Sequence, residues 1–305
     1  MQSSLIASPL NYTGGKFKLL TQILPLFPNR INTFVDLFSG GCNVGLNVKS
    51  KQVIYNDIND KLINLYKFFK SIDARKAIEQ IYDIISRYEL SIVSKHGYDF
   101  YKCDSSKGLG EYNKSHFLRL RDDFNAMSSN STDYYLTFYV MIVYAFNNQI
   151  RFNLSGEFNL PVGKRDFNTR MEQKLVNFID RIHKQDCFFT CVDFRNYDIS
   201  KLDENDFVYV DPPYLITCAT YNENGGWGEQ DERDLLDFLD SLSARKIKFA
   251  LSNVLINKGR ENEILKSWLD NRIYKVYHLN YKYSNSNYQI KDKTSTSDEV
   301  LITNY

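Results

Sequence analysis

The sequence predicts an α/β protein whose mostly parallel sheet is interrupted by a helical insertion. Near both ends of the chain, short apolar runs typical of buried strands alternate with stretches compatible with helices. Between them, apolar side chains recur at helical spacing over most of residues 61–170. We therefore expect one domain from residues 1–60 and 171–305, and a second, inserted domain from residues 61–170.

Four apolar runs predict the strands of the sheet: Thr33–Phe38, Gln52–Asp57, Phe207–Val210 and Ile247–Leu251. The first run is closed by Ser39-Gly40-Gly41 and precedes a helix-compatible stretch, which is typical of strand, tight turn and helix. Leucines at helical spacing predict a helix between the third and the fourth run. Val300–Ile302 is expected to close the sheet as an edge strand.

The predicted insertion has two parts. Helical spacing of apolar residues continues from Leu62 to about Phe146. After Asn147 the chain turns to short polar and extended pieces that contain Gly156 and Gly163. Because glycines between extended pieces favour turns, we expect a hairpin in this part.

The composition excludes several classes of protein. Hydrophobic residues make up 43% and charged residues 25%, which excludes a disordered or fibrous chain. Lys and Arg number 38 against 37 Asp and Glu, so a nucleic-acid footprint has to be a local patch. Aromatic residues reach 15%, enough to fill a core or to stack on flat ligands such as bases. Five cysteines without a CxxC pair and four scattered histidines predict neither a disulfide scaffold nor a zinc site.

The chain is expected to be a soluble cytoplasmic protein. Met1 to Leu5 lacks the charged-then-apolar layout of a signal peptide. The longest apolar stretch, Tyr134 to Phe146, has 13 residues and is too short to cross a bilayer. No membrane partner is therefore expected.

The glycine turn after the first predicted strand is the first candidate site. A glycine turn lets a ligand lie close to the backbone, and Asp57, at the end of the next strand, can hold two ribose hydroxyls. The segment from Gly40 to Gly45 is not a GxGxxG pattern, which disfavours a pyrophosphate cofactor and leaves room for another adenosine-bearing one. Such a turn is also common as plain structure in α/β proteins.

The second candidate site is Asp211-Pro212-Pro213-Tyr214, at the end of a predicted strand where open α/β sheets bind ligands. Two prolines remove two backbone donors and leave stiff acceptor carbonyls. An acid, the Pro212 carbonyl and an aromatic ring together suit a planar ring that bears an amino group. Asn11-Tyr12-Thr13-Gly14-Gly15-Lys16, taken alone, indicates only a surface turn with a solvated lysine.

Four motifs resemble, in their order along the chain, those of the Dam-type DNA adenine methyltransferases of the α group. They are Tyr12 to Lys16, Phe34 to Gly41, Asn56-Asp57-Ile58 and Asp211-Pro212-Pro213-Tyr214. The likeness covers nearly the whole chain and is greatest to the T-even phage Dam enzymes, where residues 206–217, 251–255, 150–153 and 161–165 look alike. Gly97 to Lys114 looks like an insertion relative to the phage enzymes.

The resemblance implies transfer of a methyl group from S-adenosyl-L-methionine to the exocyclic amine of adenine in double-stranded DNA, without a metal. It implies a Rossmann-like methyltransferase sheet with an inserted target-recognition domain of helices and a DNA-reading hairpin. Asp211, Pro212, Pro213 and Tyr214 would be catalytic, with two acceptors on the amine and Tyr214 stacked on a base flipped out of the duplex. The cofactor would contact Tyr12, Lys16, Phe38, Ser39, Gly40, Gly41, Asp57, Ile58 and Asp211. Among these, Phe38 to Gly41 would hold the methionine part, Asp57 the ribose and Ile58 the adenine ring.

The same resemblance implies a local DNA-binding surface. Its residues would be Asn147, Gln149, Arg151, Asn153, Pro161, Lys164 and Arg165. Arg165 matches the family position that reads the outer guanine, and arginine is the usual bidentate reader of guanine. Gln149 departs from the apolar residue common at its position. The expected target is GATC, although the insertion at Gly97 to Lys114 leaves room for another site.

Three other functions remain compatible with parts of the sequence. Related acid-Pro-Pro-aromatic motifs also serve the methylation of RNA adenine or of protein glutamine. A catalytically silent DNA-binding regulator is disfavoured, because a binder has no need of the intact motif at Asp211. A nicotinamide oxidoreductase is disfavoured by the broken GxGxxG pattern. The sequence determines neither the oligomeric state, monomeric or higher, nor whether a restriction enzyme accompanies the chain.

Overall fold

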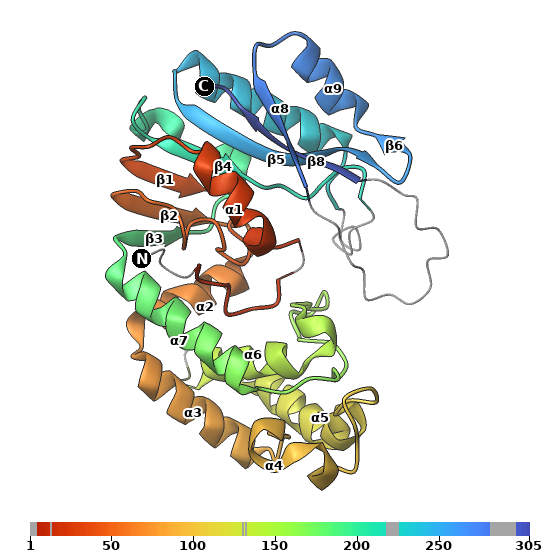
Figure 1. The fold of residues 1–305 in the computed structure, drawn as a ribbon. Helices are drawn as coiled ribbons and strands as arrows, with labels where there is room; N and C mark the ends of the chain where they lie inside the picture. Colours follow the sequence, from red (N-terminus) through yellow and green to blue (C-terminus); the bar gives the residue numbers. More distant parts are fainter. Residues whose placement is uncertain (1–4, 13, 130, 132, 218–225, 281–296) are drawn as a thin grey trace. The chain divides into compact units, whose positions relative to one another are not determined.

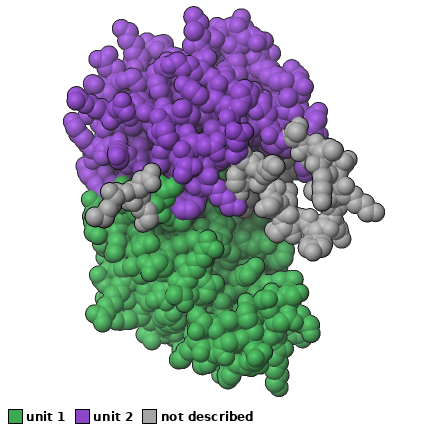
Figure 2. All heavy atoms as spheres, in the orientation of Figure 1, with its two compact units in different colours: residues 1–15, 64–184 green, residues 16–63, 185–305 purple. Residues whose placement is uncertain are grey.

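The computed structural model describes residues 5–12, 14–129, 131, 133–217, 226–280 and 297–305. They fall into two compact units, coloured separately in Figure 2: residues 1–15 with 64–184, and residues 16–63 with 185–305. We call them the helical unit and the sheet unit. Residues 171–184, and residues 1–15, belong to the helical unit.

The sheet unit is built around an eight-stranded sheet, counted over the described residues (Figure 1). The strands run in the order β3-β2-β1-β4-β5-β8-β7, with β6 paired to β5. The first five of this order are parallel, whereas β8 is antiparallel to β5 and β7. The strands are β1 (Thr33–Asp36), β2 (Gln52–Asn56), β3 (Cys187–Thr190), β4 (Phe207–Val210), β5 (Lys248–Asn257), β6 (Arg260–Glu261), β7 (Lys275–Leu279) and β8 (Ser297–Thr303).

The sheet is packed on both faces, which is why β4 is apolar and buried at all four of its positions. On one face, α8 (Glu229–Ala244) and α9 (Glu263–Asp270) share an apolar cluster with β1, β4, β5 and β8. On the other face, aromatic rings of Phe27, Phe34, Phe207 and Tyr209 lie 4.8–6.4 Å apart. Short turns of helix complete this unit: η1 (Lys16–Leu19), α1 (Leu20–Ile23), η2 (Leu24–Leu26), η4 (Phe194–Asn196) and η5 (Ile199–Lys201).

The α/β prediction is confirmed, and three details of the predicted sheet are wrong. The chain after Gly41 forms consecutive turns over residues 43–47 rather than a helix. The segment at Val300 to Ile302 is not an edge strand, because β8 lies between β5 and β7. Strands β3 and β7 were not predicted; four of the five residues of β7 are exposed or half-buried, so its apolar signal is weak.

The helical unit contains α3 (Ala74–Arg87), α4 (Val93–Phe100), α5 (Gly110–Ala126), α6 (Tyr134–Tyr144), η3 (Phe146–Asn148) and α7 (Thr169–Lys184). Helix α2 (Asp60–Ser71) starts in the sheet unit and continues into this one. Helix α6 is the centre of the core, because every residue from Leu136 to Tyr144 is buried. Its apolar character all round the helix explains why it resembles a membrane segment in composition.

The segment after α6 folds back on itself. Ala145 pairs with Val162, and Phe152 pairs with Phe158, both antiparallel. The predicted hairpin is therefore present, with its turn around Gly156, whose backbone φ is +77°. Across the described ranges, no helix combines the length and the apolar character needed to span a bilayer.

Candidate active site

The candidate site lies at the carboxyl ends of β1, β2 and β4. These neighbouring strands are parallel, with Asp36 of β1 in register with Tyr55 of β2 and Tyr209 of β4. The chain leaves β1 toward one side (β2) and β4 lies on the other, so this is the point where open α/β sheets form a ligand crevice. Residues that directly follow the three strands, Leu37 to Gly41, Asp57 and Asp211, are therefore brought to one edge.

Buried Asn56 ties these strand ends together, a role that the sequence analysis missed. Its side-chain amide donates to the carbonyl oxygens of Leu37 at 3.0 Å and Val192 at 2.9 Å. Its side-chain oxygen accepts from the Thr190 hydroxyl at 2.8 Å and from the Val192 N–H at 3.1 Å. One side chain thus satisfies four groups and fixes the loops that follow β1 and β3.

The glycine turn and Asp57 are joined directly. The N–H of Gly40 donates to Asp57 Oδ2 at 2.9 Å, and the N–H of Asn59 donates to Asp57 Oδ1 at 2.9 Å. Gly40 has a backbone φ of +43°, in the region that favours glycine. Each carboxylate oxygen keeps a further acceptor position, so Asp57 can still receive two hydroxyl donors. Burial raises the pKa of Asp57, and the two N–H groups oppose that rise.

Asp36 adds a second buried carboxyl group beside this turn. Its Oδ2 accepts from the Gly45 N–H at 3.1 Å. A Cβ atom at Gly45 would meet Tyr55 Cε1 at 2.4 Å, which explains the glycine at this position by packing rather than by cofactor contact. Burial raises the pKa of Asp36 to about 8, and the charges of Asp211 and Asp57 act in the same direction.

Four side chains meet at the end of β4. Lys16 Nζ lies 2.9 Å from Asp211 Oδ1 and 3.4 Å from Glu299 Oε1. The hydroxyl of Tyr214 lies 3.0 Å from Asp211 Oδ1 and 3.3 Å from Glu299 Oε1. The Lys16 ammonium also lies over the Tyr214 ring, 4.9 Å from its centroid. We call Lys16, Asp211, Tyr214 and Glu299 the acid–lysine cluster.

The acid–lysine cluster corrects the sequence-based reading of Lys16 as a solvated side chain. Only 3% of the Lys16 side chain is exposed, because it extends toward two carboxylates. Glu299, 3% exposed on β8, was not singled out in the sequence. It sits in a strand otherwise buried and apolar from Val300 to Ile302, and that charged position beside an apolar run was the available signal.

The two oxygens of Asp211 have different surroundings. Oδ1 receives both Lys16 and Tyr214, whereas Oδ2 has no hydrogen-bond partner within the part of the chain that the structure describes. The carbonyl oxygen of Pro212 likewise accepts no hydrogen bond from the described residues. Burial raises the pKa of Asp211, and the Lys16 ammonium holds that rise down. One carboxylate oxygen and one carbonyl are thus available as neighbouring acceptors.

Apolar groups border the glycine turn. Ile58 follows Asp57 and is 68% exposed, which is unusual for isoleucine and suits a platform for a flat ligand. The rings of Phe38, Phe194 and Trp227 lie 5.5–5.8 Å from one another. Trp227 Nε1 donates to Glu232 Oε2 at 2.6 Å, so a buried carboxylate anchors this aromatic wall. Phe38 was predicted as a cofactor contact, whereas no role was predicted for Phe194 or Glu232.

The DNA-binding candidates all lie in the helical unit, in or beside the hairpin. Phe146 is 47% exposed, and Asn147 and Asn148 have φ of +54° and +53°. Arg151 Nε donates to Asn159 Oδ1 at 2.8 Å, and Asn153 Nδ2 donates to Glu157 Oε2 at 2.8 Å. Pro161 and Lys164 contribute carbonyl oxygens to the base of the hairpin, which accept from the N–H groups of Phe146 and Leu109. Gln149 and Arg165 flank these positions.

The segment that looks like an insertion, residues 97–114, supports the hairpin. The Leu109 N–H donates to the Lys164 carbonyl at 3.2 Å, and a Cβ atom at Gly108 would lie 2.7 Å from Lys164 Cβ. Asn113 Oδ1 accepts from the Ser91 N–H at 2.9 Å, and the Tyr144 hydroxyl donates to the Ser91 carbonyl at 2.6 Å. These contacts connect the segment to both ends of the hairpin.

Tyr12 belongs to the helical unit, so its expected place beside the cofactor stays a prediction. Lys16, Asp211 and Tyr214 are brought into contact, and Gly40 is brought to Asp57. Within the described ranges, no group of three or more His, Cys, Asp and Glu side chains could hold a metal ion.

Comparison with known proteins identifies the family to which the chain belongs. Residues 12–285 match the D12 class N6 adenine-specific DNA methyltransferase family. The chain is 42% identical over 306 residues to modification methylase StsI of Streptococcus sanguinis, which covers 98% of the chain and 43% of that relative. It is 42% identical over 309 residues to type II methyltransferase M.FokI of Planomicrobium okeanokoites, covering 99% of the chain and 43% of that relative. The chain therefore spans less than half the length of these two relatives.

A DNA adenine methylase of Haemophilus influenzae is 28% identical over 250 residues, 80% of the chain and 78% of that relative. The type II methylases therefore match this chain more strongly than the Dam-named relative does. The family resemblance read from the motifs is confirmed, but the particular likeness to phage Dam enzymes is replaced by one to modification methylases.

Proposed function

Because the chain belongs to the D12 class of N6 adenine-specific DNA methyltransferases, we propose that it moves a methyl group from S-adenosyl-L-methionine to the exocyclic amine of an adenine in double-stranded DNA. The corresponding activity is EC 2.1.1.72. The observation that carries the proposal is the pair of open acceptors, Asp211 Oδ2 and the Pro212 carbonyl, beside the joined Gly40 and Asp57. The mixed sheet is consistent with the Rossmann-like fold of methyltransferases.

The residues at the edge of the sheet fit the cofactor. The buried hydroxyl of Ser39 has no hydrogen-bond partner among the described residues, as expected of a group that awaits a polar ligand. Asp57 keeps acceptor positions for ribose hydroxyls, and exposed Ile58 offers an apolar face for an adenine ring. The carboxyl groups of Asp57 and Asp211 suit a ligand with positive charge. When bound, the cofactor supplies an electrophilic methyl group on a sulfonium.

The acid–lysine cluster orients the acceptors for the adenine amine. Lys16 and Tyr214 both hold Oδ1 of Asp211, so Oδ2 is fixed and can accept one amine hydrogen. The Pro212 carbonyl can accept the other, which favours a tetrahedral amine whose lone pair points at the methyl group. The base has to leave the duplex to reach this pocket, and the Tyr214 ring offers it a stacking face.

The charge of the acid–lysine cluster supports the displacement. Positive charge builds on the amine nitrogen as the methyl group moves, and preorganised negative charge stabilises it. Lys16 alone would cancel the charge of Asp211. Glu299, 3.4 Å from the same ammonium, restores one net negative charge to the cluster. Lys16 lowers the pKa of Asp211 against the effect of burial, and the charge of Glu299 raises it again.

The DNA target is a short site read by the hairpin, and GATC is the first candidate. The positions of Arg165 and of Asn147 to Asn153 support this part of the proposal through the family resemblance. Two relatives are named as modification or type II methylases, so we also propose that methylation protects the site from a partner endonuclease.

Transfer of labelled methyl groups into matched duplexes tests the proposal. One duplex carries GATC, one carries GTTC, and a third pool carries randomised sequence. We expect label only in duplexes with one short adenine-containing motif. Label in the randomised pool but not in the GATC duplex would show that the enzyme methylates DNA at another target sequence. Label in RNA or protein but in no duplex would refute DNA methylation.

A further inference from the structure

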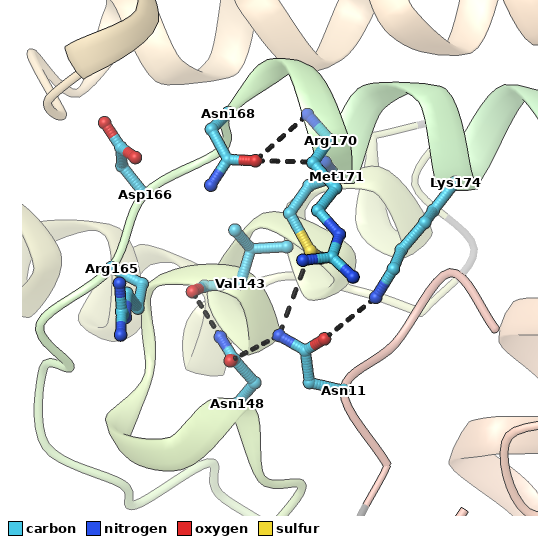
Figure 3. Close-up of a pocket in the computed structure, with 9 residues that line it drawn as sticks. All are labelled: Asn11, Val143, Asn148, Arg165, Asp166, Asn168, Arg170, Met171 and Lys174. Atoms are coloured by element: carbon cyan, nitrogen blue, oxygen red, sulfur yellow. Dashed lines mark hydrogen bonds between the residues drawn. The ribbon is translucent and has the colours of Figure 1, made fainter. Parts of the chain in front are cut away.

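The helical unit contains a polar cavity that includes no residue of the acid–lysine cluster. The cavity has a volume of about 350 Å³ and lies where the N-terminal segment, the hairpin base and the start of α7 come together (Figure 3). Arg165, Arg170 and Lys174 line it, together with Asn11 and Asp166. No role was predicted for Asn11 or Lys174 from the sequence.

Asn11 holds one wall of this cavity in place. Its side-chain amide donates to Asn148 Oδ1 at 3.0 Å, and its side-chain oxygen accepts from Lys174 Nζ at 3.1 Å (Figure 3). Asn148 in turn donates to the carbonyl oxygen of Val143 at 2.6 Å, which anchors it to α6. The Lys174 ammonium is therefore positioned by a neutral amide rather than by a carboxylate.

Among the described residues that line the cavity, cations outnumber acids by three to one. Within the described part of the chain, Arg165, Arg170 and Lys174 form no ion pair with a carboxylate. Asp166 is the one acid that lines the cavity, and its Oδ2 accepts from the Val93 N–H at 2.5 Å. Burial raises the pKa of Asp166, while backbone hydrogen bonds and the charge of the neighbouring Arg165 oppose that rise. Burial and the neighbouring Arg170 lower the pKa of Lys174, as expected where cations gather without an anion.

We propose that this cavity binds one phosphate group of the DNA backbone, beside the bases that the hairpin contacts. The proposal rests on the proposed function and deepens it by naming a phosphate subsite. A guanidinium and an ammonium can bond a phosphate together, and such contacts set the register of a protein on the duplex. Asn11 and Asn148 in the wall of the cavity are neutral, so a phosphate that enters the cavity meets hydrogen-bonding groups and a net positive charge.

Single methylphosphonate substitutions along a duplex with the methylated site locate this contact. Each substitution removes the charge of one phosphate. The 305-residue chain is compared with Arg170→Gln, Lys174→Gln and, as matched control, Lys184→Gln on the exposed last turn of the same helix. Dissociation constants are measured for every duplex, and for the unmodified duplex over a range of salt concentrations.

We expect a methylphosphonate at one position to weaken DNA binding by the wild-type chain about tenfold. The same substitution should have no effect on DNA binding by the Arg170 and Lys174 variants. Loss of one phosphate contact lowers the slope of log affinity against log salt by about 1. The Lys184 variant should keep both the slope and the sensitive position.

Three results would overturn the subsite. The first is that no phosphate position has an effect that depends on Arg170 or Lys174. The second is that the slope of log affinity against log salt is unchanged in both variants. The third is that the loss of affinity follows the base sequence instead of the phosphate charge. In each of these cases the wild-type chain still methylates DNA, so the proposed function stands. Failure of the wild-type chain to bind or methylate any duplex would overturn both proposals.

Discussion

The ammonium of Lys16 lies 2.9 Å from Oδ1 of Asp211, and both side chains are largely withdrawn from water. The hydroxyl of Tyr214 is directed at the same oxygen. The other oxygen, Asp211 Oδ2, accepts no hydrogen bond from the described residues and can therefore accept one from a ligand. The ion pair between Lys16 and Asp211 therefore orients the Asp211 carboxylate.

Asp211→Asn should remove most methyl transfer while DNA binding remains. The amide cannot offset positive charge on the amine, and loss of one preorganised group of this kind costs about 10²–10³-fold in kcat. Single-turnover rates and two dissociation constants measure the effect. The control is Asp237→Asn on the exposed face of α8. Retained turnover in the Asp211 variant would refute the mechanism.

Glu299→Gln tests the net charge of the acid–lysine cluster. The substitution keeps the shape of the side chain and leaves the charges of Lys16 and Asp211 to cancel each other, so we expect kcat to fall about tenfold. The neighbouring Asp298→Asn serves as control, because Asp298 contacts His278 instead. An equal fall in both variants would indicate a general loss of strand β8 and would contradict the charge argument.

Lys16→Met should move the acidic limb of the pH–rate profile to higher pH. The Lys16 ammonium lowers the pKa of Asp211 against the effect of burial, and its removal lets that pKa rise. Because transfer needs the ionised carboxylate, activity at low pH falls first. The profile of single-turnover rate against pH checks the shift. An unchanged profile would show that Lys16 does not control the ionisation of Asp211.

Asp57→Ala should weaken binding of S-adenosyl-L-methionine by about 10- to 100-fold, the worth of one or two hydrogen bonds to a charged group. It also removes the acceptor for the Gly40 N–H. Calorimetric titration measures the dissociation constant. DNA binding, measured in parallel, should change little, and an unchanged cofactor affinity would remove Asp57 from the ribose site.

Asp36→Asn should change how stability depends on pH. In the folded chain the pKa of Asp36 is raised to about 8, so the carboxyl group binds its proton more tightly than in the unfolded chain. Its contribution to stability is therefore lost as pH rises from about 4 to about 8. The variant lacks this loss, so it should gain stability relative to wild type by up to about 1.4 kcal/mol per pH unit in this window.

Denaturant unfolding of both proteins at pH 6, 7 and 8 measures this difference. A constant difference across the three pH values would show that Asp36 is ionised throughout. The cofactor is left out of the solutions, because a bound cation beside Asp36 would favour the ionised form.

Short-range patterns were enough to predict the central strands and their loops. Apolar runs mark β1, β2 and β4 because these strands are buried on both faces, and Asp57 and Asp211 follow them directly. Since parallel neighbours end at one edge, the approach of Gly40 to Asp57 follows from the sequence pattern together with the strand order.

Contacts between distant segments could not be read from the sequence in this way. Glu299 joins the acid–lysine cluster because β8 enters antiparallel between β5 and β7, a placement that no local pattern encodes. Lys16 is buried only because two carboxylates from other strands meet its ammonium, and the same side chain in a loop would be solvated. The cavity at Asn11 and Lys174 likewise depends on packing between segments far apart in the chain.

The features that the sequence predicted depend on interactions between residues close together in the chain. Periodicity, strand-ending acids and turn residues act over a few neighbours, so they specify elements and the residues at their ends. Charge balance in a buried site depends on which strands become neighbours, and that is set by the free energy of packing the whole unit. The sequence therefore indicated Asp211 and Lys16 as candidate site residues, while the tertiary structure decided that they meet each other and Glu299.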